Sequence, residues 1–251
     1  TSLTVYSLLW FFIEFFQASF LINFLVSGGI CLGLAIFMGM YFPSFEEKSQ
    51  QNKSIVLRKR YWLYYLLTFL SGARRQIFVV FAAFLMVEKF GYSVSEVTLL
   101  FLVNYAFNWL FAEKIGQLIG RIGERRALTL EYTGLIFVFV AYGLVENATL
   151  AACLYVVDHM FFALAIGIKT YFQKIADPAD MASSAGVSFT INHIAAVVIP
   201  AALGLVWLWS HALVFYFGAM FALLSLIASQ LIPRDPMQGK DCLLYTSPSP
   251  R

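Results

Sequence analysis

Long apolar stretches recur along the whole chain, and short clusters of charged residues, glycines and prolines separate them. A helix needs about 20 predominantly apolar residues to cross the hydrocarbon core of a bilayer. Seven stretches approach or exceed this length, so the pattern predicts seven membrane-spanning helices. Their expected positions are 20–42, 61–87, 97–111, 127–145, 150–172, 184–207 and 213–232.

The composition is that of a membrane protein and not of a water-soluble one. Of the 251 residues, 61% are hydrophobic and only 12% are charged, whereas soluble domains carry about 25% charged residues. The polar segments between the apolar stretches are too short for a soluble catalytic domain. We therefore expect an all-α, polytopic helical bundle, integral to the lipid bilayer. The net charge of +3 is small and the basic residues are dispersed, so no nucleic-acid partner is expected.

The Lys and Arg residues lie on alternate connections between the predicted helices. Fourteen of the 17 follow the first, third, fifth or seventh helix, and the exceptions are Arg74, Arg75 and Lys89. Basic residues in short loops concentrate on the cytoplasmic side of a membrane. The distribution therefore places these four helix exits in the cytoplasm, and we expect a plasma or inner membrane.

The two ends of the chain differ from its middle. We interpret 1–19 as the end of a truncated helix with an outer loop, 20–42 as one helix, 43–60 as a cytoplasmic loop, 61–233 as a six-helix unit and 234–251 as a cytoplasmic tail. Within the tail, residues 242–251 read CLLYTSPSPR and share no composition with what precedes them. We interpret this segment as non-native read-through that lies outside the fold.

The three cysteines give no sign of metal or redox chemistry. Cys31, Cys153 and Cys242 are far apart, and neither a CxxC pair nor a histidine at ligand spacing accompanies them. We expect passive thiols, no metal site and no cofactor.

The connection between the third and fourth predicted helices reads GQLIGRIGERRAL, from Gly116 to Leu128. It resembles the signature loop of the major facilitator superfamily, in which glycines, an acidic residue and a basic pair form a tight cytoplasmic turn. The residues that carry the resemblance are Gly116, Leu118, Gly120, Arg121, Gly123, Arg125, Arg126 and Leu128, with Gly120 in place of the usual aspartate and Glu124 in place of one arginine. The glycines are expected to permit a sharp turn, and the arginines to bind helix-end carbonyls and lipid headgroups. A generic basic loop is the alternative interpretation.

A second resemblance covers residues 174–204, which are similar to the loop between the family's tenth and eleventh helices and to the body of the eleventh. Asp177 as a cap, Pro178 at the first helical position and Asp180 in the first turn also predict a helix start on local grounds. Pro200 is expected to kink this helix, and Gly204 to permit close packing against a neighbour.

The resemblance implies that the seven helices correspond to the family's helices six to twelve, preceded by the end of helix five. It implies a secondary transporter, not an enzyme, that moves a small-molecule substrate by alternating access and is coupled to an ion, which we expect to be the proton. Its partner would be a missing N-terminal half of the same protein. Two alternatives from other classes are a membrane-embedded enzyme that processes lipids or glycans and a non-transporting scaffold.

Ionisable or strongly polar side chains inside apolar helices are costly and are the default functional candidates. They are Arg74, Arg75, Asn104, Asn108, Asp158, His159 and His193. Helical spacing predicts one polar stripe on the second helix, formed by Tyr64, Thr68, Ser71 and Arg75. Arg74 shares its face with apolar residues, so we expect Arg75 to face a water-filled cavity. Glu131, one turn inside the fourth helix, is expected to reach back to the cytoplasmic interface.

Two interpretations of these candidates are open at the level of sequence. In the functional one, Arg75 attracts an anionic substrate group or pairs with Asp158. A coupling proton is then taken up by Asp158 together with His159 or His193. In the structural one, Arg and Asp form a fixed buried pair and the two asparagines link helices. The number of costly groups favours the functional interpretation.

Overall fold

The computed structural model describes residues 7, 10–11, 20–42 and 57–244, and all regular elements within them are helices. Seven helical segments are long and apolar enough to cross a membrane, which confirms the expected number and the all-α class. In chain order the elements are α2 (Phe20–Tyr41), the 3-10 turn η1 (Lys59–Tyr61), α3 (Trp62–Gln76), the π-helical η2 (Ile77–Ala82), α4 (Ala83–Glu88), α5 (Val94–Ile122), α6 (Glu124–Leu144), α7 (Ala148–Phe162), the 3-10 turn η3 (Ala163–Ala165), α8 (Ile166–Ile175), the 3-10 turn η4 (Pro178–Asp180), α9 (Met181–Trp207) and α10 (His211–Ser229).

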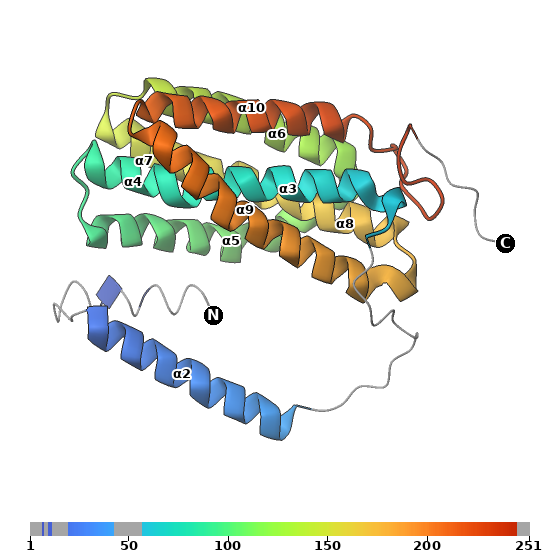
Figure 1. The fold of residues 1–251 in the computed structure, drawn as a ribbon, viewed down its shortest axis with the longest axis horizontal. Helices are drawn as coiled ribbons and strands as arrows, with labels where there is room; N and C mark the ends of the chain where they lie inside the picture. The colour runs from blue at the N-terminus through green and yellow to red at the C-terminus, as the bar shows by residue number, and fades with distance from the viewer. Residues whose placement is uncertain (1–6, 8–9, 12–19, 43–56, 245–251) are drawn as a thin grey trace.

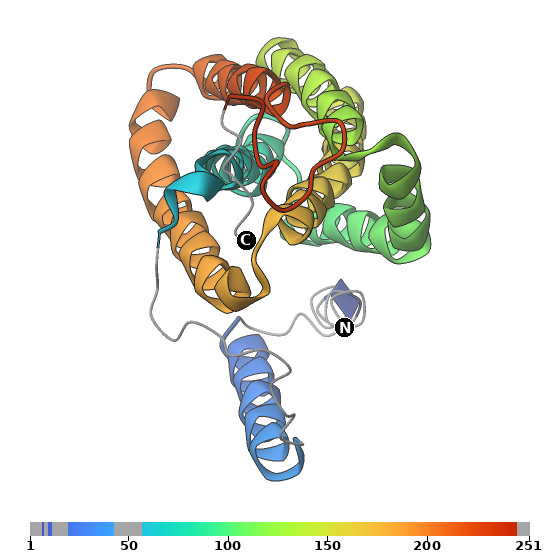
Figure 2. The same cartoon turned by 90° about the vertical axis from the view of Figure 1, so that its right-hand side faces the viewer.

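Six spanning segments form one bundle, and α2 lies apart from it (Figure 1). The end-on view shows α3 in the middle, with α9 and α10 on one side and α6 and α8 on the other (Figure 2). α6 packs along α10 and α7, while α5 packs against α7. α3 therefore lies among helices that come from both sides of the bundle, and it contacts α8, α9 and α10.

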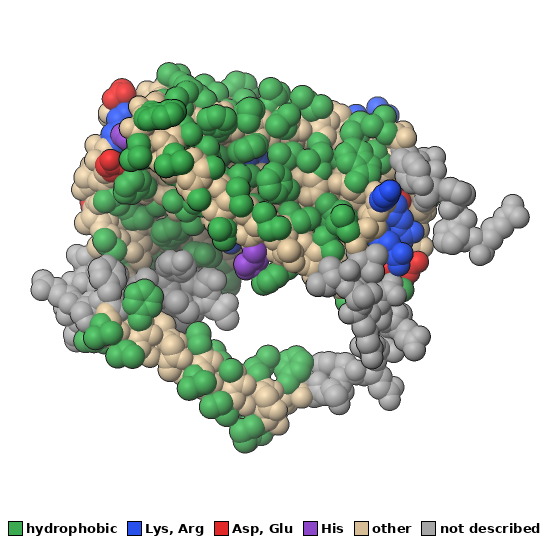
Figure 3. Space-filling model, viewed as in Figure 1, with side chains coloured by type: hydrophobic (Ala, Val, Ile, Leu, Met, Phe, Trp, Pro, Cys, Tyr) green, Lys and Arg blue, Asp and Glu red, His purple; other side chains and the backbone are tan. Residues whose placement is uncertain are grey.

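The sides of the bundle are apolar and its ends are charged. Hydrophobic side chains cover the visible flank, while Lys, Arg, Asp and Glu gather at the two ends (Figure 3). Many large hydrophobic residues of the bundle are exposed, among them Phe137, Val197 and Leu205. Such a surface is stable in contact with lipid tails but not with water, so the outer face of the bundle is the membrane-facing one.

The third spanning helix is longer than the predicted 97–111. It starts earlier because Ser93 and Glu96 form a reciprocal capping box, in which the Ser93 N–H donates to Glu96 Oε2 at 2.7 Å and the Glu96 N–H donates to Ser93 Oγ at 3.2 Å. It continues through the expected loop to Ile122 and ends only at Gly123, whose φ of 83° suits glycine. Gly116 and Gly120 lie inside α5, so the expectation that several glycines shape the turn is wrong: Gly123 alone makes it.

The predicted start of the sixth spanning segment is confirmed, with one difference in detail. The Asp177 side chain accepts a hydrogen bond from the Ala179 N–H at 3.0 Å, as a cap does, and Pro178 opens the segment. The first turn is the 3-10 turn η4, and α9 follows it directly. Pro200 lies inside α9, which runs without interruption from Met181 to Trp207.

Close helix packing occurs at other glycines than the one expected. A methyl group added to Gly204 would meet open space, so the close approach predicted there is wrong. A methyl group on Gly72 of α3 would lie 2.8 Å from Asn192 Oδ1 of α9. On Gly134 of α6 it would lie 2.4 Å from the Phe161 ring. Gly204 faces outward because the proline-containing half of α9 contacts its neighbours through a different side.

The described part of the tail packs against one end of the bundle. Gln238 donates to the Ala176 carbonyl at 3.0 Å, and the Leu243 N–H donates to the Leu231 carbonyl at 2.9 Å. Cys242 is only 1% exposed and joins a buried cluster with Tyr171. The expectation that the chain leaves the fold at residue 242 is therefore wrong for 242–244, because an apolar side chain there fills a gap in the core. Residues 245–251 lie outside the described part of the chain, as does most of the predicted helix remnant in 1–19.

Candidate functional site

A cavity of about 460 Å³ opens on the bundle between α3, α5, α7, α8 and α9. Its polar lining consists of Tyr64, Thr68, Ser71, Arg75, Asn104, Tyr105, Asn108, His159, Lys169, Ser188 and Asn192. Its aromatic walls are Phe78, Phe101 and Phe162. All four residues of the polar stripe predicted on the second helix lie on this wall. Four of the seven candidates, namely Arg75, Asn104, Asn108 and His159, line the cavity together.

The neighbours Arg74 and Arg75 lie in different surroundings. Arg75 is exposed on the cavity wall, whereas Arg74 is 1% exposed and points into the bundle. The cause is helical geometry, because successive side chains are rotated by about 100° around the axis. The helix also widens into the π-helical η2 directly after them, at Ile77. Such π-bulges interrupt α-helices frequently at functional sites.

Arg74 belongs to a buried charge cluster. Its Nη2 lies 3.5 Å from Glu131 Oε1, and both side chains are completely buried. Its guanidinium carbon lies 4.4 Å from the centre of the Tyr132 ring, and its Nε donates to the Leu70 carbonyl at 3.3 Å. Glu131 does not reach back to the interface as expected, because the opposite charge of Arg74 holds it inside.

Asp158 is the third member of this cluster, which we call the buried charge cluster: Arg74, Glu131 and Asp158. Asp158 is 1% exposed and interacts electrostatically with both Arg74 and Glu131. Neither carboxylate oxygen of Asp158 has a hydrogen-bond partner among the described residues. The expected pairing of Asp158 with Arg75 is thus replaced by proximity to Arg74.

The adjacent residues Asp158 and His159 face opposite ways. His159 lines the cavity, where its Nε2 lies 3.0 Å from Asn108 Nδ2. On the same helix as Asn108, Asn104 is 1% exposed, and its amide has no partner among the described residues for either its nitrogen or its oxygen. Asn104 lines the cavity, so these unsatisfied atoms are positioned to bind a polar group that enters it.

His193 is the candidate that the structure separates from the others. It is exposed, its Nδ1 lies 2.9 Å from the Phe189 carbonyl, and its ring packs on that of Phe189. The preceding residue, Asn192, lines the cavity instead. The same rotation between successive residues explains why His193 turns away from it.

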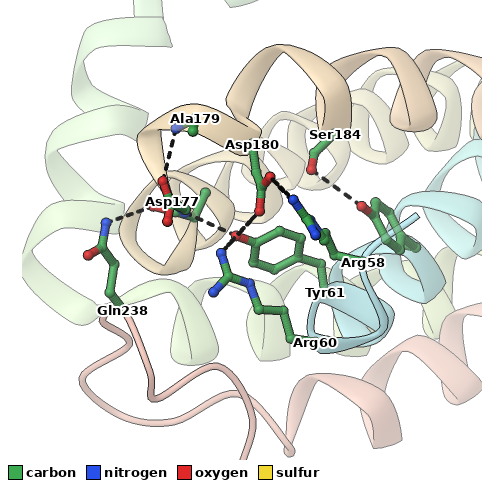
Figure 4. Close-up of polar contacts among 10 residues, drawn as sticks. Arg58, Arg60, Tyr61, Asp177, Ala179, Asp180, Ser184 and Gln238 are labelled. Carbon is green, nitrogen blue, oxygen red and sulfur yellow. Dashed lines mark hydrogen bonds and ion pairs between the residues drawn. The ribbon is translucent and has the colours of Figure 1, made fainter. Parts of the chain in front are cut away.

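A second polar cluster closes the end of the bundle where η1 meets α9. The Asp180 carboxylate is buried and forms ion pairs with Arg58 at 2.9 Å and Arg60 at 3.2 Å (Figure 4). The Asp177 N–H donates to the Tyr61 hydroxyl at 3.0 Å in the same cluster. The hydrogen bond to Asp180 raises the pKa of Arg58 above its ordinary value. Sequence reasoning treated Asp180 as a helix-start residue only, because its basic partners are 120 or more positions away.

Two charged residues of the signature loop region contact other helical segments or their ends. Arg125 donates to the Gln230 side chain at 3.1 Å, at the end of α10, and not to a helix-end carbonyl. Glu124 is buried and pairs with Lys174 at 2.6 Å. Arg121 and Arg126 are exposed. The glutamate at the position of a usual arginine therefore has a partner supplied by α8.

Sequence reasoning missed two charged residues of the site region. Lys169 was counted among the loop cations, yet it stands on α8 and lines the cavity. Glu131 was assigned to the interface although Arg74, on another helix, pairs with it. The depth of Lys169 inside an apolar stretch was the available signal.

The comparison with protein families fits this architecture of spanning helices around a polar cavity. The sequence model of the Major Facilitator Superfamily matches residues 5–200. The chain belongs to the major facilitator superfamily. It is therefore an integral, multi-pass membrane protein of the transporter type, and members of this superfamily bind small-molecule substrates within the membrane. No curated protein matches the sequence of this superfamily member.

Proposed function

We propose that this chain forms the C-terminal half, helices six to twelve, of a major facilitator transporter that moves a small solute by alternating access. In this proposal, the cavity is its half of the substrate site, and an N-terminal half of the same protein supplies the opposite wall. The cavity supports this because its polar lining comes from four spanning segments and lies between charged ends (Figure 3). A volume of about 460 Å³ suits a small molecule.

We further propose that transport is coupled to protons through Asp158. The buried charge cluster holds one cation, Arg74, and two carboxylates, Glu131 and Asp158. A low-dielectric interior disfavours net charge, so one bound proton balances the cluster. Asp158 is the acceptor because neither of its oxygens has a hydrogen-bond partner among the described residues, whereas Glu131 is paired with Arg74 at 3.5 Å.

The surroundings of Asp158 support the same assignment. Arg74 approaches it from α3, and Glu131 and Tyr142 from α6. The next residue on its own helix, His159, lines the cavity. A change of charge on Asp158 therefore alters the electrostatic potential close to the proposed substrate site, because the next residue lines the cavity. The single observation that carries this function is that Asp158 is buried next to a cavity-lining residue and has no hydrogen-bond partner in the described part of the chain.

The test uses the full-length protein that contains this chain, reconstituted in liposomes with an imposed pH gradient. Uptake of labelled compounds is compared between the parent protein and Asp158→Asn. The amide keeps the size of the carboxyl but binds no proton, so gradient-driven uptake is expected to fall by about 100-fold or more. Counterflow, which exchanges substrate without a gradient, is expected to persist.

Glu113→Gln is the matched control, because Glu113 is an exposed acid on α5 whose contact is with Gln117 on the same helix. It is expected to transport like the parent. Normal gradient-driven uptake by Asp158→Asn would overturn proton coupling through this residue. A lack of any gradient-driven or counterflow transport by the parent would overturn the transport function itself.

A further inference from the structure

We propose that the cavity binds a small organic anion with a flat, aromatic body. This rests on the transport role proposed above and names the chemical class of its substrate. Three features of the cavity carry it. Two of its cations form no ion pair with a described residue, a buried amide has no hydrogen-bond partner in the described part of the chain, and aromatic rings form the remaining walls.

The charges of the cavity are all positive. Arg75 from α3 and Lys169 from α8 are the charged residues of its lining, and no Asp or Glu stands among the described residues that line it. Neither cation forms an ion pair with a described residue. Cations inside a membrane are costly unless an anion compensates them. Arg75 and Lys169 are therefore expected to bind an anion that the described part of the chain does not supply.

Several charged side chains of the bundle have an oppositely charged partner. Asp180 is held by two arginines, Glu124 by Lys174 and Glu131 by Arg74. At the opposite end, Lys89 pairs with Glu146 at 3.1 Å. Arg75 and Lys169, in contrast, line the same cavity and form no ion pair with a described residue.

Asn104 offers the ligand a hydrogen-bonding group inside the cavity. It is 1% exposed, and its amide nitrogen and oxygen lack hydrogen-bond partners within the described residues, although it lines the cavity. An unsatisfied buried amide costs free energy until a ligand binds it. The Asn104 amide nitrogen can donate a hydrogen bond to an oxygen of a carboxylate or sulfonate. Arg75 and Lys169, which line the same cavity, attract the same anionic group.

Aromatic rings form the remaining walls. Phe78, Phe101 and Phe162 line the cavity together with Tyr64 and Tyr105. The His159 ring lies 6.1 Å from the Phe78 ring and 6.4 Å from the Tyr105 ring, measured between centres. Such a set binds a flat apolar body through stacked and edge contacts. A hydrophilic anion such as a sugar phosphate would make fewer apolar contacts with these rings than a flat aromatic one.

The test measures equilibrium binding by calorimetry on the full-length protein in nanodiscs of neutral phosphatidylcholine, without any gradient. The probe is benzenesulfonate, which stays negatively charged at every working pH. Benzyltrimethylammonium has a similar ring with the opposite charge, and methanesulfonate has the charge without the ring. Saturable binding of benzenesulfonate, with much weaker binding of both others, is expected. Stronger binding of benzyltrimethylammonium, or no saturable binding of benzenesulfonate, overturns the proposal.

Variants then locate the anion. Arg75→Gln and Lys169→Gln each remove one charge-assisted contact and are expected to weaken benzenesulfonate binding by about tenfold to 100-fold. Lys169→Arg keeps the charge and is expected to retain most of the affinity. Lys114→Gln, an exposed cation on α5 outside the cavity, serves as the matched control. Equal affinities in all four variants overturn the proposal, and the probe comparison on the parent does not depend on any variant's folding.

Anionic lipid headgroups carry the same negative charge as the proposed ligand, so a separate measurement distinguishes the two. Binding is repeated in nanodiscs that contain phosphatidylglycerol, and a soluble substrate is expected to bind with an affinity changed by less than about threefold. Abolition of benzenesulfonate binding there assigns the cavity to lipid and overturns the proposal. Saturable binding of benzenesulfonate without transport would support the ligand class and contradict the transport function. Proton-driven uptake of benzyltrimethylammonium would support the transport function and contradict the ligand class.

Discussion

At the scale of the residue, the neighbours Arg74 and Arg75 face different surroundings, because successive side chains of a helix are rotated by about 100°. Arg74 lies against Glu131, Asp158 and the Tyr132 ring, where it offsets buried negative charge. Arg75 lines the cavity and has no such partner among the described residues. Because both are arginines, the difference lies entirely in direction. In the proposed function, Arg74 balances charge behind the cavity, and Arg75 contacts the substrate that enters it.

The shared use of Arg74 by two carboxylates predicts a non-additive effect on stability. With Glu131→Gln alone, Asp158 still opposes Arg74, and with Asp158→Asn alone, Glu131 does. The double variant leaves a buried arginine without any anion. We expect it to lose about 3–5 kcal/mol more than the sum of the two single losses. Thermal and denaturant unfolding of the full-length protein in detergent measures this coupling.

Two features allow the comparison of the two single variants with the double variant to be interpreted. Both substitutions replace a carboxyl by an amide of the same shape, so no cavity forms. Combining either one with Glu113→Gln, which lies on the exposed face of α5, is expected to give additive losses. Additive losses in the Glu131 and Asp158 pair would contradict a shared cation.

The limits of sequence reasoning are visible in the same residues. The direction of Arg75 follows from the helical period, because Tyr64, Thr68 and Ser71 repeat on its face and all line the cavity. The partner of Arg74 does not follow, since Glu131 is 57 positions away and the period of one helix says nothing about its neighbour. The pattern therefore predicted which side chains share a face, and tertiary packing decided which faces meet.

At the scale of the element, glycines decide how closely pairs of helices approach. Gly134 of α6 lies under the Phe161 ring of α7, and Gly218 of α10 under the Phe139 ring of α6. In each pair an aromatic side chain occupies the space that a Cβ would need. Membrane helices associate without a hydrophobic driving force, so such close contacts contribute much of their affinity.

These contacts predict opposite effects for two similar substitutions. Gly134→Ala places a methyl group 2.4 Å from the Phe161 ring and is expected to destabilise the bundle by about 1–3 kcal/mol. Gly204→Ala, also inside a helix, meets nothing within 4 Å and is expected to be neutral or stabilising by up to about 1 kcal/mol. Unfolding midpoints in one detergent measure both. A loss of similar size in both variants would contradict the assigned contacts.

The connection between α5 and α6 shows why element boundaries were harder to predict than element number. The apolar stretch ends at residue 111, yet α5 continues to Ile122, since helix formation does not require an apolar surface outside the membrane. Glu113 and Gln117 even support this extension with a hydrogen bond of 3.1 Å one turn apart. Hydropathy located the part of the helix in lipid, and only the left-handed φ of Gly123 marks its true end.

At the scale of the whole molecule, charge is sorted to two ends and one interior cluster. One end holds the cluster of Arg58, Arg60 and Asp180 (Figure 4). The other end holds Glu88, whose carboxylate accepts a hydrogen bond from the Trp207 indole at 2.8 Å. The apolar flank between them sets the position of the bundle in the bilayer. The cavity and the buried charge cluster lie between these two ends, within the spanning segments.

The distribution of basic residues predicts which end faces the cytoplasm, and cysteine labelling tests it. In a full-length protein whose Cys31, Cys153 and Cys242 are replaced by alanine, Glu146→Cys and Arg126→Cys place one thiol at each end of the bundle. Both parent side chains are exposed. Because basic loops stay in the cytoplasm, a membrane-impermeant maleimide added to intact cells is expected to label residue 146 and not residue 126. Permeabilised cells should label both, which controls for reactivity. The opposite pattern in intact cells would reverse the predicted orientation, and labelling of both thiols there would contradict a bundle that crosses the membrane between them.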